Sequence, residues 1–322
     1  MSRKIDISHK TIIFVTIFLL SLWIVYHILD LLLLLFVALI FMSALSPLIS
    51  FLQKLKIPKV LGVLIIYLLF LGAIGGLLTV SFTPLIEETT KLALTLPSAL
   101  ADLLKVNNLD PNVIQSEVSN LSKNLFSTTR AIFDNIITII FLLVLTFYLL
   151  LERENLEKRA AFLFTGQEDR IQKLLMEIEG KLGAWLRGQL FLSLIIGVLV
   201  YLGLSVLQIP YALSLSILAA FTEVIPVIGP IISAIPAILL ALTISPVLAA
   251  VVTAMYFVIQ QLENHLVVPQ VMKKAVGLNP LVVILAIAVG GRLLGIGGAL
   301  LAVPIVVVLQ IIVLDILREK NA

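Results

Sequence analysis

Long uninterrupted stretches of apolar residues dominate the chain, and several are long enough to cross a lipid bilayer as a helix. Such a helix needs about 20 predominantly apolar residues. The apolar runs occupy residues 11–29, 31–52, 60–82, 135–151, 190–207, 211–222, 224–243, 246–262, 280–290 and 293–316. The pattern predicts an all-α fold, a polytopic transmembrane helical bundle.

Two polar segments, residues 83–134 and 152–189, interrupt the apolar runs. Both keep a helical stripe of apolar side chains, which favours a helix docked on the bundle or lying at the membrane surface. A regulatory or gating role for either segment is the alternative. The chain therefore divides into N-terminal membrane helices (1–82), an extracytoplasmic helical segment (83–134), a membrane helix (135–151), a cytoplasmic amphipathic segment (152–189) and a C-terminal transport core (190–322).

The composition supports a membrane protein. Hydrophobic residues make up 61% of the chain and charged residues 13%, against about 45–50% and about 25% in ordinary soluble domains. The chain has no cysteine, which excludes thiol chemistry and cysteine metal ligands.

The distribution of Lys and Arg predicts the orientation in the membrane. Seventeen of the 22 basic residues fall at the two chain ends, in the loop at 53–59, at 273–274 and in segment 152–189, whereas segment 83–134 holds four. Basic residues concentrate on the cytoplasmic side of membrane proteins. The sequence therefore predicts a multi-pass protein of the cell (inner) membrane with both termini cytoplasmic. The basic residues do not form a surface of the kind that binds nucleic acid, so we expect no nucleic-acid partner.

Glu223 is an acidic residue that lies between two apolar runs, 211–222 and 224–243. It precedes Pro226, Gly229 and Pro230, which cannot continue a regular helix. The preceding run 211–222 reaches only about 18 Å as a helix, little more than half of a hydrocarbon core of about 30 Å. We expect a re-entrant hairpin with its tip at Glu223 to Pro230.

A second interruption follows the run 280–290. Gly291 and Arg292 come next, and Gly295 and Gly298 then lead into a final long helix. Two broken elements that approach from opposite faces are typical of a transporter's central site. We predict that Glu223 and Arg292 lie within reach of each other or of a common water-filled path. Alternatively, Arg292 caps backbone carbonyls and Glu223 satisfies amides of its own turn.

A polar cluster ends the run 246–262. It consists of Gln260, Gln261, Glu263 and Asn264. Gln260 and Asn264 are one helical turn apart, so their amides can face one lumen or bond between helices. Near the C-terminus, Asp315 is expected to reach the interface or pair with Arg318.

The sequence contains none of the motifs that would indicate an enzyme. It has no H-E-x-x-H, no G-x-S-x-G and no Walker phosphate loop, and its three histidines lack ligand spacing. We therefore expect no catalytic activity, no cofactor and no metal centre.

Taken together, the motifs resemble the autoinducer-2 exporter (AI-2E) family, formerly an uncharacterised permease family. The resemblance covers nearly the whole chain. It is most specific in the stretch from Glu223 to Pro230, and it continues in 260–264 with Pro269, in 277–280, and in 295–298 followed by 302–304. It implies about eight membrane helices, a homo-oligomer and export of a small solute. Some relatives are described as sodium (lithium)/proton antiporters.

Three functions stay open at this point. The first is a permease that exports a small polar solute such as autoinducer-2, with or without proton coupling, and the second is a sodium (lithium)/proton antiporter. The third is a membrane scaffold that transports nothing. The expected partners are a small polar solute, or a monovalent cation or proton, together with the lipid bilayer and further copies of the chain. The candidate binding residues are Glu223, Pro226, Gly229, Pro230, Gln260, Gln261, Glu263, Asn264, Gly291, Arg292, Gly295 and Gly298.

Overall fold

The computed structural model describes residues 9–73, 75–76, 136–226, 228–275 and 277–320. Every regular element in these ranges is a helix, which confirms the all-α membrane bundle. Five of the described helices are long and apolar enough to cross a membrane. The extracytoplasmic segment predicted at 83–134 lies outside the described residues.

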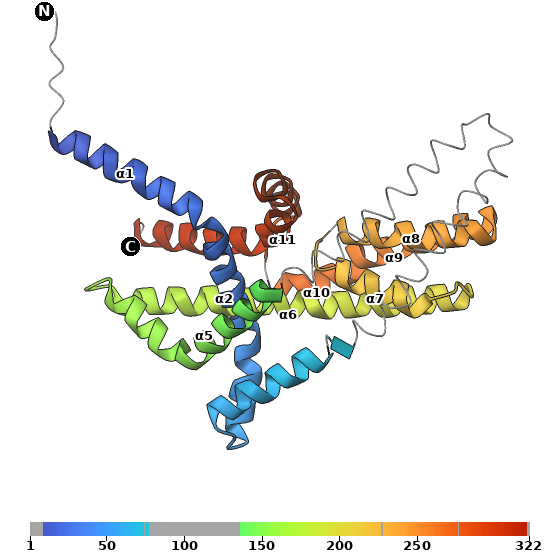
Figure 1. Cartoon of the computed structure of the whole chain (residues 1–322), viewed down its shortest axis with the longest axis horizontal. Helices are drawn as coiled ribbons and strands as arrows, with labels where there is room; N and C mark the ends of the chain where they lie inside the picture. The colour runs from blue at the N-terminus through green and yellow to red at the C-terminus, as the bar shows by residue number, and fades with distance from the viewer. Residues whose placement is uncertain (1–8, 74, 77–135, 227, 276, 321–322) are drawn as a thin grey trace, which may run out of the picture.

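Figure 1 shows the order of the helices, and the described connections between consecutive helices from α5 to α11 are short. Their bounds are α1 His9–His27, α2 Leu29–Lys54, an unlabelled helix Lys59–Ala73, α5 Ile136–Phe162, α6 Glu168–Val206, α7 Ala212–Thr222, α8 Ile228–Ile244, α9 Pro246–Leu262, the π-helix η1 Glu263–Val267, α10 Val268–Ala275 and α11 Pro280–Lys320. The sequence pattern located the first two helices to within two residues.

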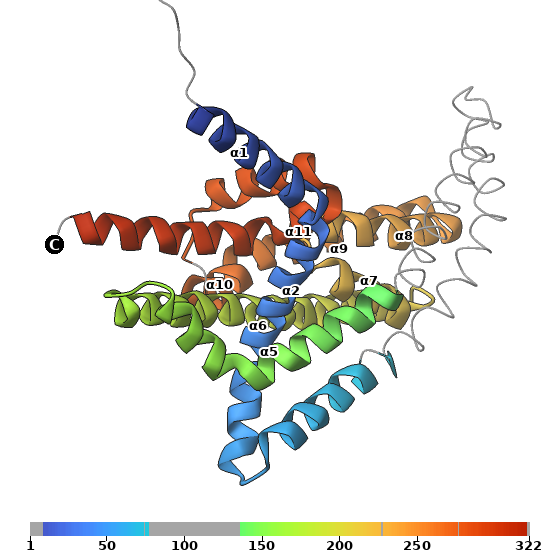
Figure 2. The same cartoon turned by 60° about the vertical axis from the view of Figure 1, so that its left-hand side comes forward.

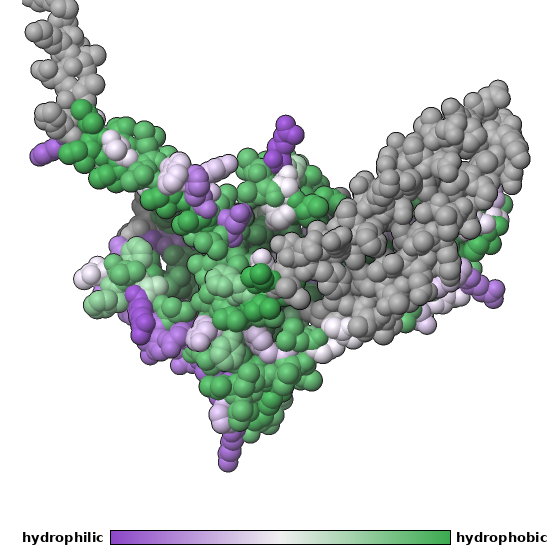
Figure 3. Space-filling model, in the orientation of Figure 1, coloured by the Kyte–Doolittle hydropathy of each residue, from purple (hydrophilic) through white to green (hydrophobic). Residues whose placement is uncertain are grey.

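The outer surface is apolar, as a bilayer requires. Hydrophobic side chains cover most of the described face in Figure 3, and charged side chains gather in a few places. Along α1 no residue of the span is buried inside the protein. Its Ile, Leu and Phe side chains are therefore placed to contact lipid or another protein chain.

The central element is α6, a helix of 39 residues. It packs against α2, α5, α7, α9, α10 and α11, and α2 crosses it in both cartoon views (Figures 1 and 2). Helix α5 continues without a break past residue 152, and α6 continues without a break past residue 189. The polar segment 152–189 therefore forms the end of α5 and the beginning of α6 rather than one helix. The break between them falls at Gly166, whose positive φ of 87° suits glycine.

Both broken elements predicted in the C-terminal half are present. Helices α7 and α8 form a hairpin whose turn includes residues 223–226. The long helix α11 is interrupted at Leu294 and Gly295, where Gly295 has a φ of 62°, and it folds back on itself as two arms, 280–293 and 296–320. One buried apolar core joins α6 to α7, α8 and α9, and a second joins α2 and α6 to α11.

The two arms of α11 touch at a pair of glycines. A Cβ atom on Gly290 would collide with the carbonyl oxygen of Gly298, and a Cβ on Gly298 with that of Gly290. Gly298→Ala should therefore lower stability by roughly 1–3 kcal/mol, since backbone atoms cannot make room cheaply. Thermal unfolding in nanodiscs measures the effect. Gly297→Ala, where a Cβ meets nothing within 4 Å, is the control, and equal melting temperatures for the two variants would refute the close contact.

Candidate functional site

The turn between α7 and α8 is closed by local backbone hydrogen bonds. Because Pro226 has no N–H, the carbonyl of Thr222 accepts instead from the N–H of Ile225, at 3.0 Å. The N–H of Gly229 then donates to the carbonyl of Ile225, at 2.9 Å, and starts α8. Gly229 passes so close to the carbonyl of Thr222 that no Cβ would fit there.

A side chain from α6 holds this turn from outside. The side-chain amide of Gln189 donates from Nε2 to the backbone carbonyl of Glu223, at 2.6 Å. Gln189 is 1% exposed and Glu223 is 0% exposed. The tip of the hairpin is therefore fixed against the middle of α6.

The carboxyl group of Glu223 meets a second buried carboxyl group. Glu263 is 4% exposed, and its carboxyl lies within hydrogen-bonding reach of that of Glu223. Gln260 donates from Nε2 to Oε2 of Glu263, at 3.0 Å, and its contact with Oδ1 of Asn264 is longer, at 3.5 Å. Two acids 40 positions apart in the sequence thus form one site, built from the α7–α8 turn and the end of α9.

The π-helix η1 explains how Glu263 reaches this position. The α-helical pattern of α9 ends at Leu262, and Glu263–Val267 follow with π-type hydrogen bonding. Such bulges shift the direction of the side chains after them and occur often at functional sites. Here Glu263 is buried while Asn264, His265 and Leu266 are exposed.

The pair has no cationic partner in the described part of the chain. None of the ion pairs there includes Glu223 or Glu263. Both carboxyl oxygens of Glu223 are buried without a hydrogen-bond donor. Two adjacent, buried, ionised carboxylates are very costly, so the arrangement requires a bound proton or a small cation. The described residues contain no cluster of three or more metal-ligating side chains.

The other predicted site residues lie around this pair or apart from it. Pro226 in the turn and Pro230 at the start of α8 are half-buried, and Gln261 is exposed on α9. Arg292 is exposed near the end of the first arm of α11, beside Gly291, and forms no hydrogen bond or ion pair with Glu223. The site shared by Glu223 and Arg292 stays a prediction.

Sequence reasoning missed two polar residues of α6. Gln189 lies immediately before the apolar run 190–207, and Ser193 follows it one helical turn later. Ser193 is 6% exposed, and its hydroxyl has no hydrogen-bond partner among the described residues. A buried amide at the start of an apolar run is the signal that could have identified Gln189.

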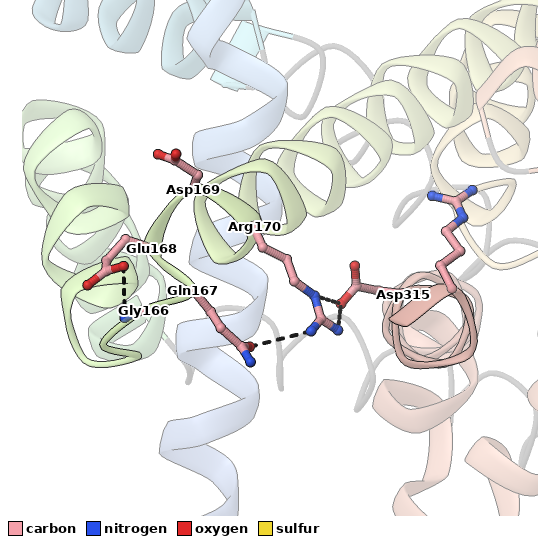
Figure 4. A pocket seen from close by; sticks show the side chains of 7 residues that line it. Gly166, Gln167, Glu168, Asp169, Arg170 and Asp315 are labelled. Carbon is pink, nitrogen blue, oxygen red and sulfur yellow. Dashed lines mark hydrogen bonds and ion pairs between the residues drawn. The ribbon is translucent and has the colours of Figure 1, made fainter. Parts of the chain in front are cut away.

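A separate charged contact joins the beginning of α6 to the end of α11. Arg170 donates to Oδ2 of Asp315 from Nε at 3.0 Å and from Nη2 at 2.7 Å (Figure 4). The expected pairing of Asp315 with Arg318 is therefore wrong, because folding brings a base from 145 positions away into better geometry. An open pocket of about 590 Å³ surrounds the pair and includes Glu168, which accepts from the N–H of Gly166.

Loss of this ion pair should have a small effect. Both side chains are roughly a quarter exposed, at 28% for Arg170 and 23% for Asp315, so solvent screens the attraction. We expect Asp315→Asn to lower the free energy of unfolding by about 1 kcal/mol or less. Urea unfolding in detergent micelles, compared with Asp169→Asn at an exposed site, tests this. A loss of several kcal/mol would show that the contact is more than a screened surface pair.

Comparison with known proteins places these features in a family. The sequence model described as AI-2E family transporter matches residues 12–318. The chain is 30% identical to the putative transport protein YrrI of Bacillus subtilis over 86% of its own length and 84% of the relative. It is 27% identical to the AI-2 transport protein TqsA of Escherichia coli (83% and 80%) and 24% identical to a sodium-lithium/proton antiporter of Halobacillus andaensis (85% and 86%).

The match extends over the site itself, since residues 12–318 include the α7–α8 turn, the end of α9 and both arms of α11. These relatives are named as transport proteins, and the fold is a multi-pass bundle of apolar helices. On these grounds the chain belongs to the AI-2E family of membrane transporters.

Proposed function

We propose that this transporter exports a small polar solute in exchange for protons, and that Glu223 and Glu263 together bind the proton. The single observation that carries the proposal is the buried contact of two carboxyl groups with no base beside them. One proton shared by the pair removes the repulsion between two carboxylates, as in other acid pairs that share a site.

The position of the pair supports a role in transport. It lies where the α7–α8 hairpin turns against α6 and where α9 passes into its π-helix, so three elements meet there. Broken helices near a central site are common in secondary transporters, in which one element rocks against another. Movement of the hairpin tip would separate Glu223 from Glu263 and release the proton.

The chemistry of the site fits a small polar molecule. Gln260 and Asn264 offer amide groups beside the acid pair, and Ser193 offers an unpaired hydroxyl on α6. Autoinducer-2 is the candidate substrate, because the relative TqsA is named an AI-2 transport protein. We place the protein in the cell membrane with both termini in the cytoplasm, in accord with the distribution of basic residues. The resemblance to the family further implies a homo-oligomer.

Sodium (lithium)/proton antiport is the second candidate. The same carboxyl oxygens are hard ligands of the kind that alkali cations prefer, and a relative from Halobacillus andaensis carries that name. In this alternative the cation takes the place of the shared proton, and no organic solute is needed.

Reconstitution distinguishes the two. Purified protein is reconstituted into liposomes whose lumen is one pH unit more acidic than the external buffer, and the membrane potential is clamped. One proton exchanged per solute molecule drives autoinducer-2 into the lumen to about tenfold excess, because one pH unit is worth 1.36 kcal/mol. Accumulation of sodium or lithium without autoinducer-2 selects the antiporter, and accumulation of neither overturns the proposal.

A further inference from the structure

Gln189 is a buried polar side chain that is not part of the proposed proton-binding pair. It lies on α6 at 1% exposure, in a helix whose following residues are almost all apolar. An amide in such surroundings is costly unless its groups are hydrogen-bonded. Its one hydrogen bond in the described residues runs to the backbone of the proposed site, at 2.6 Å from the carbonyl oxygen of Glu223.

The bond acts where the helix is interrupted. A carbonyl of an unbroken helix accepts from an N–H four residues later, and the Pro-Gly turn disturbs that pattern around Glu223. Gln189 supplies a donor from a different helix instead. The amide orientation is unambiguous, because a carbonyl oxygen can accept only from the NH₂ side of the amide.

This contact also determines where the Glu223 side chain points. The backbone of Glu223 is held on one side by α6, while its carboxyl group faces Glu263 at the end of α9. Gly229 closes the turn tightly against Thr222, so the tip has little freedom apart from rotation of the whole hairpin. Without the bond to α6, such a rotation would carry the carboxyl away from its partner.

We infer that Gln189 is a positioning residue, whose hydrogen bond to the Glu223 carbonyl holds the two carboxyl groups together so that transport stays coupled to the proton. The inference rests on the proposed function. It assigns no contact with the solute to Gln189. Removal of the bond should let the hairpin tip move without proton exchange, so that solute slips through uncoupled.

The test is the accumulation ratio per pH unit, measured in the same liposomes with autoinducer-2 in one arm and sodium in the other. Gln189→Met keeps the length of the side chain and removes the donor. We expect its ratio to fall from about tenfold to below about threefold. Gln310→Met, at an exposed position on α11, is the matched control and should keep the tenfold ratio.

The accumulation ratio per pH unit distinguishes a positioning role of Gln189 from an effect of the substitution on folding. A variant that merely folds less well transports more slowly, but its equilibrium ratio per pH unit is unchanged, because that ratio does not depend on the amount of active protein. A tenfold ratio in Gln189→Met would therefore overturn the inference. If that variant cannot be purified, Gln189→Glu provides the second test: its protonated acid can donate to the same carbonyl, so the ratio should be tenfold at acidic pH and fall as the pH rises.

Failure of the proposed function would look different. If wild-type protein shows a ratio near one with both probes, the acid pair does not couple transport. If wild-type protein shows a tenfold ratio and Gln189→Met matches it, coupling stands and Gln189 is only structural.

Discussion

Glu223→Gln should abolish the coupling of transport to protons while leaving the fold intact. The substitution keeps the shape of the side chain and fixes it in a neutral form, so the buried pair loses the group that binds and releases the proton. The accumulation of autoinducer-2 should fall from about tenfold per pH unit to a ratio near one. Thermal unfolding should change little, because the neutral amide takes the place of the protonated carboxyl group next to Glu263 and leaves the net charge of the buried pair unchanged.

Glu263→Gln should produce the same loss, since the two carboxyl groups are proposed to share one proton. Glu154→Gln is the matched control: the chemical change is identical, but the side chain of Glu154 is 74% exposed and lies on α5, which does not contribute to the acid pair. A tenfold ratio that survives in Glu223→Gln would contradict the proton site. A ratio of about a hundredfold in the wild type would show that each carboxyl carries its own proton.

The helix breaks could be predicted from the sequence because they have local causes. Pro226 and Pro230 remove backbone donors within a few residues of Glu223, and Gly295 adopts a positive φ that other residues avoid. The turn between α7 and α8 and the fold-back of α11 therefore lie where the sequence pattern predicts an interruption.

The pairing at the site could not be predicted in this way. Glu263 is brought to Glu223 by the packing of α7, α8 and α9 and by the π-helix at Glu263–Val267, and no local residue pattern identifies that change of helix type. Sequence reasoning placed Glu263 in a polar cluster and predicted that Glu223 lies within reach of Arg292 or of a water-filled path common to both, because two broken elements from opposite faces are typical of a transporter's central site. The structure brings Glu263 to Glu223, whereas Arg292 is exposed on another element and the site it would share with Glu223 stays a prediction.

The same limit applies to contacts between distant helices. Arg170 and Asp315 are 145 positions apart, and Gln189 and Glu223 are 34 apart. Each pair forms because α6 is long enough to touch most of the other helices along its length. An amphipathic pattern shows which face of such a helix is buried, but it does not identify which residue of another helix packs against that face.

Gly229→Ala should disrupt the site severely, because the added methyl group would collide with the backbone of the α7–α8 turn. A Cβ at this position would overlap the carbonyl oxygen of Thr222 and approach the backbone nitrogen of Glu223 to 2.8 Å. Both are backbone atoms, so relief requires the α7–α8 turn to open. We expect a loss of stability of roughly 1–3 kcal/mol and at least about a tenfold loss of transport rate, because the Glu223 carboxyl moves with the turn.

Transport rate and thermal unfolding, measured on the same nanodisc and liposome preparations, separate the two effects. Gly180→Ala is the control, since it lies in the exposed part of α6 and its Cβ would meet nothing within 4 Å. In that helix the change should raise stability by up to about 1 kcal/mol. A Gly229→Ala protein with wild-type rate and melting temperature would show that the turn is looser than its hydrogen bonds imply, and that Glu223 is not held in place by it.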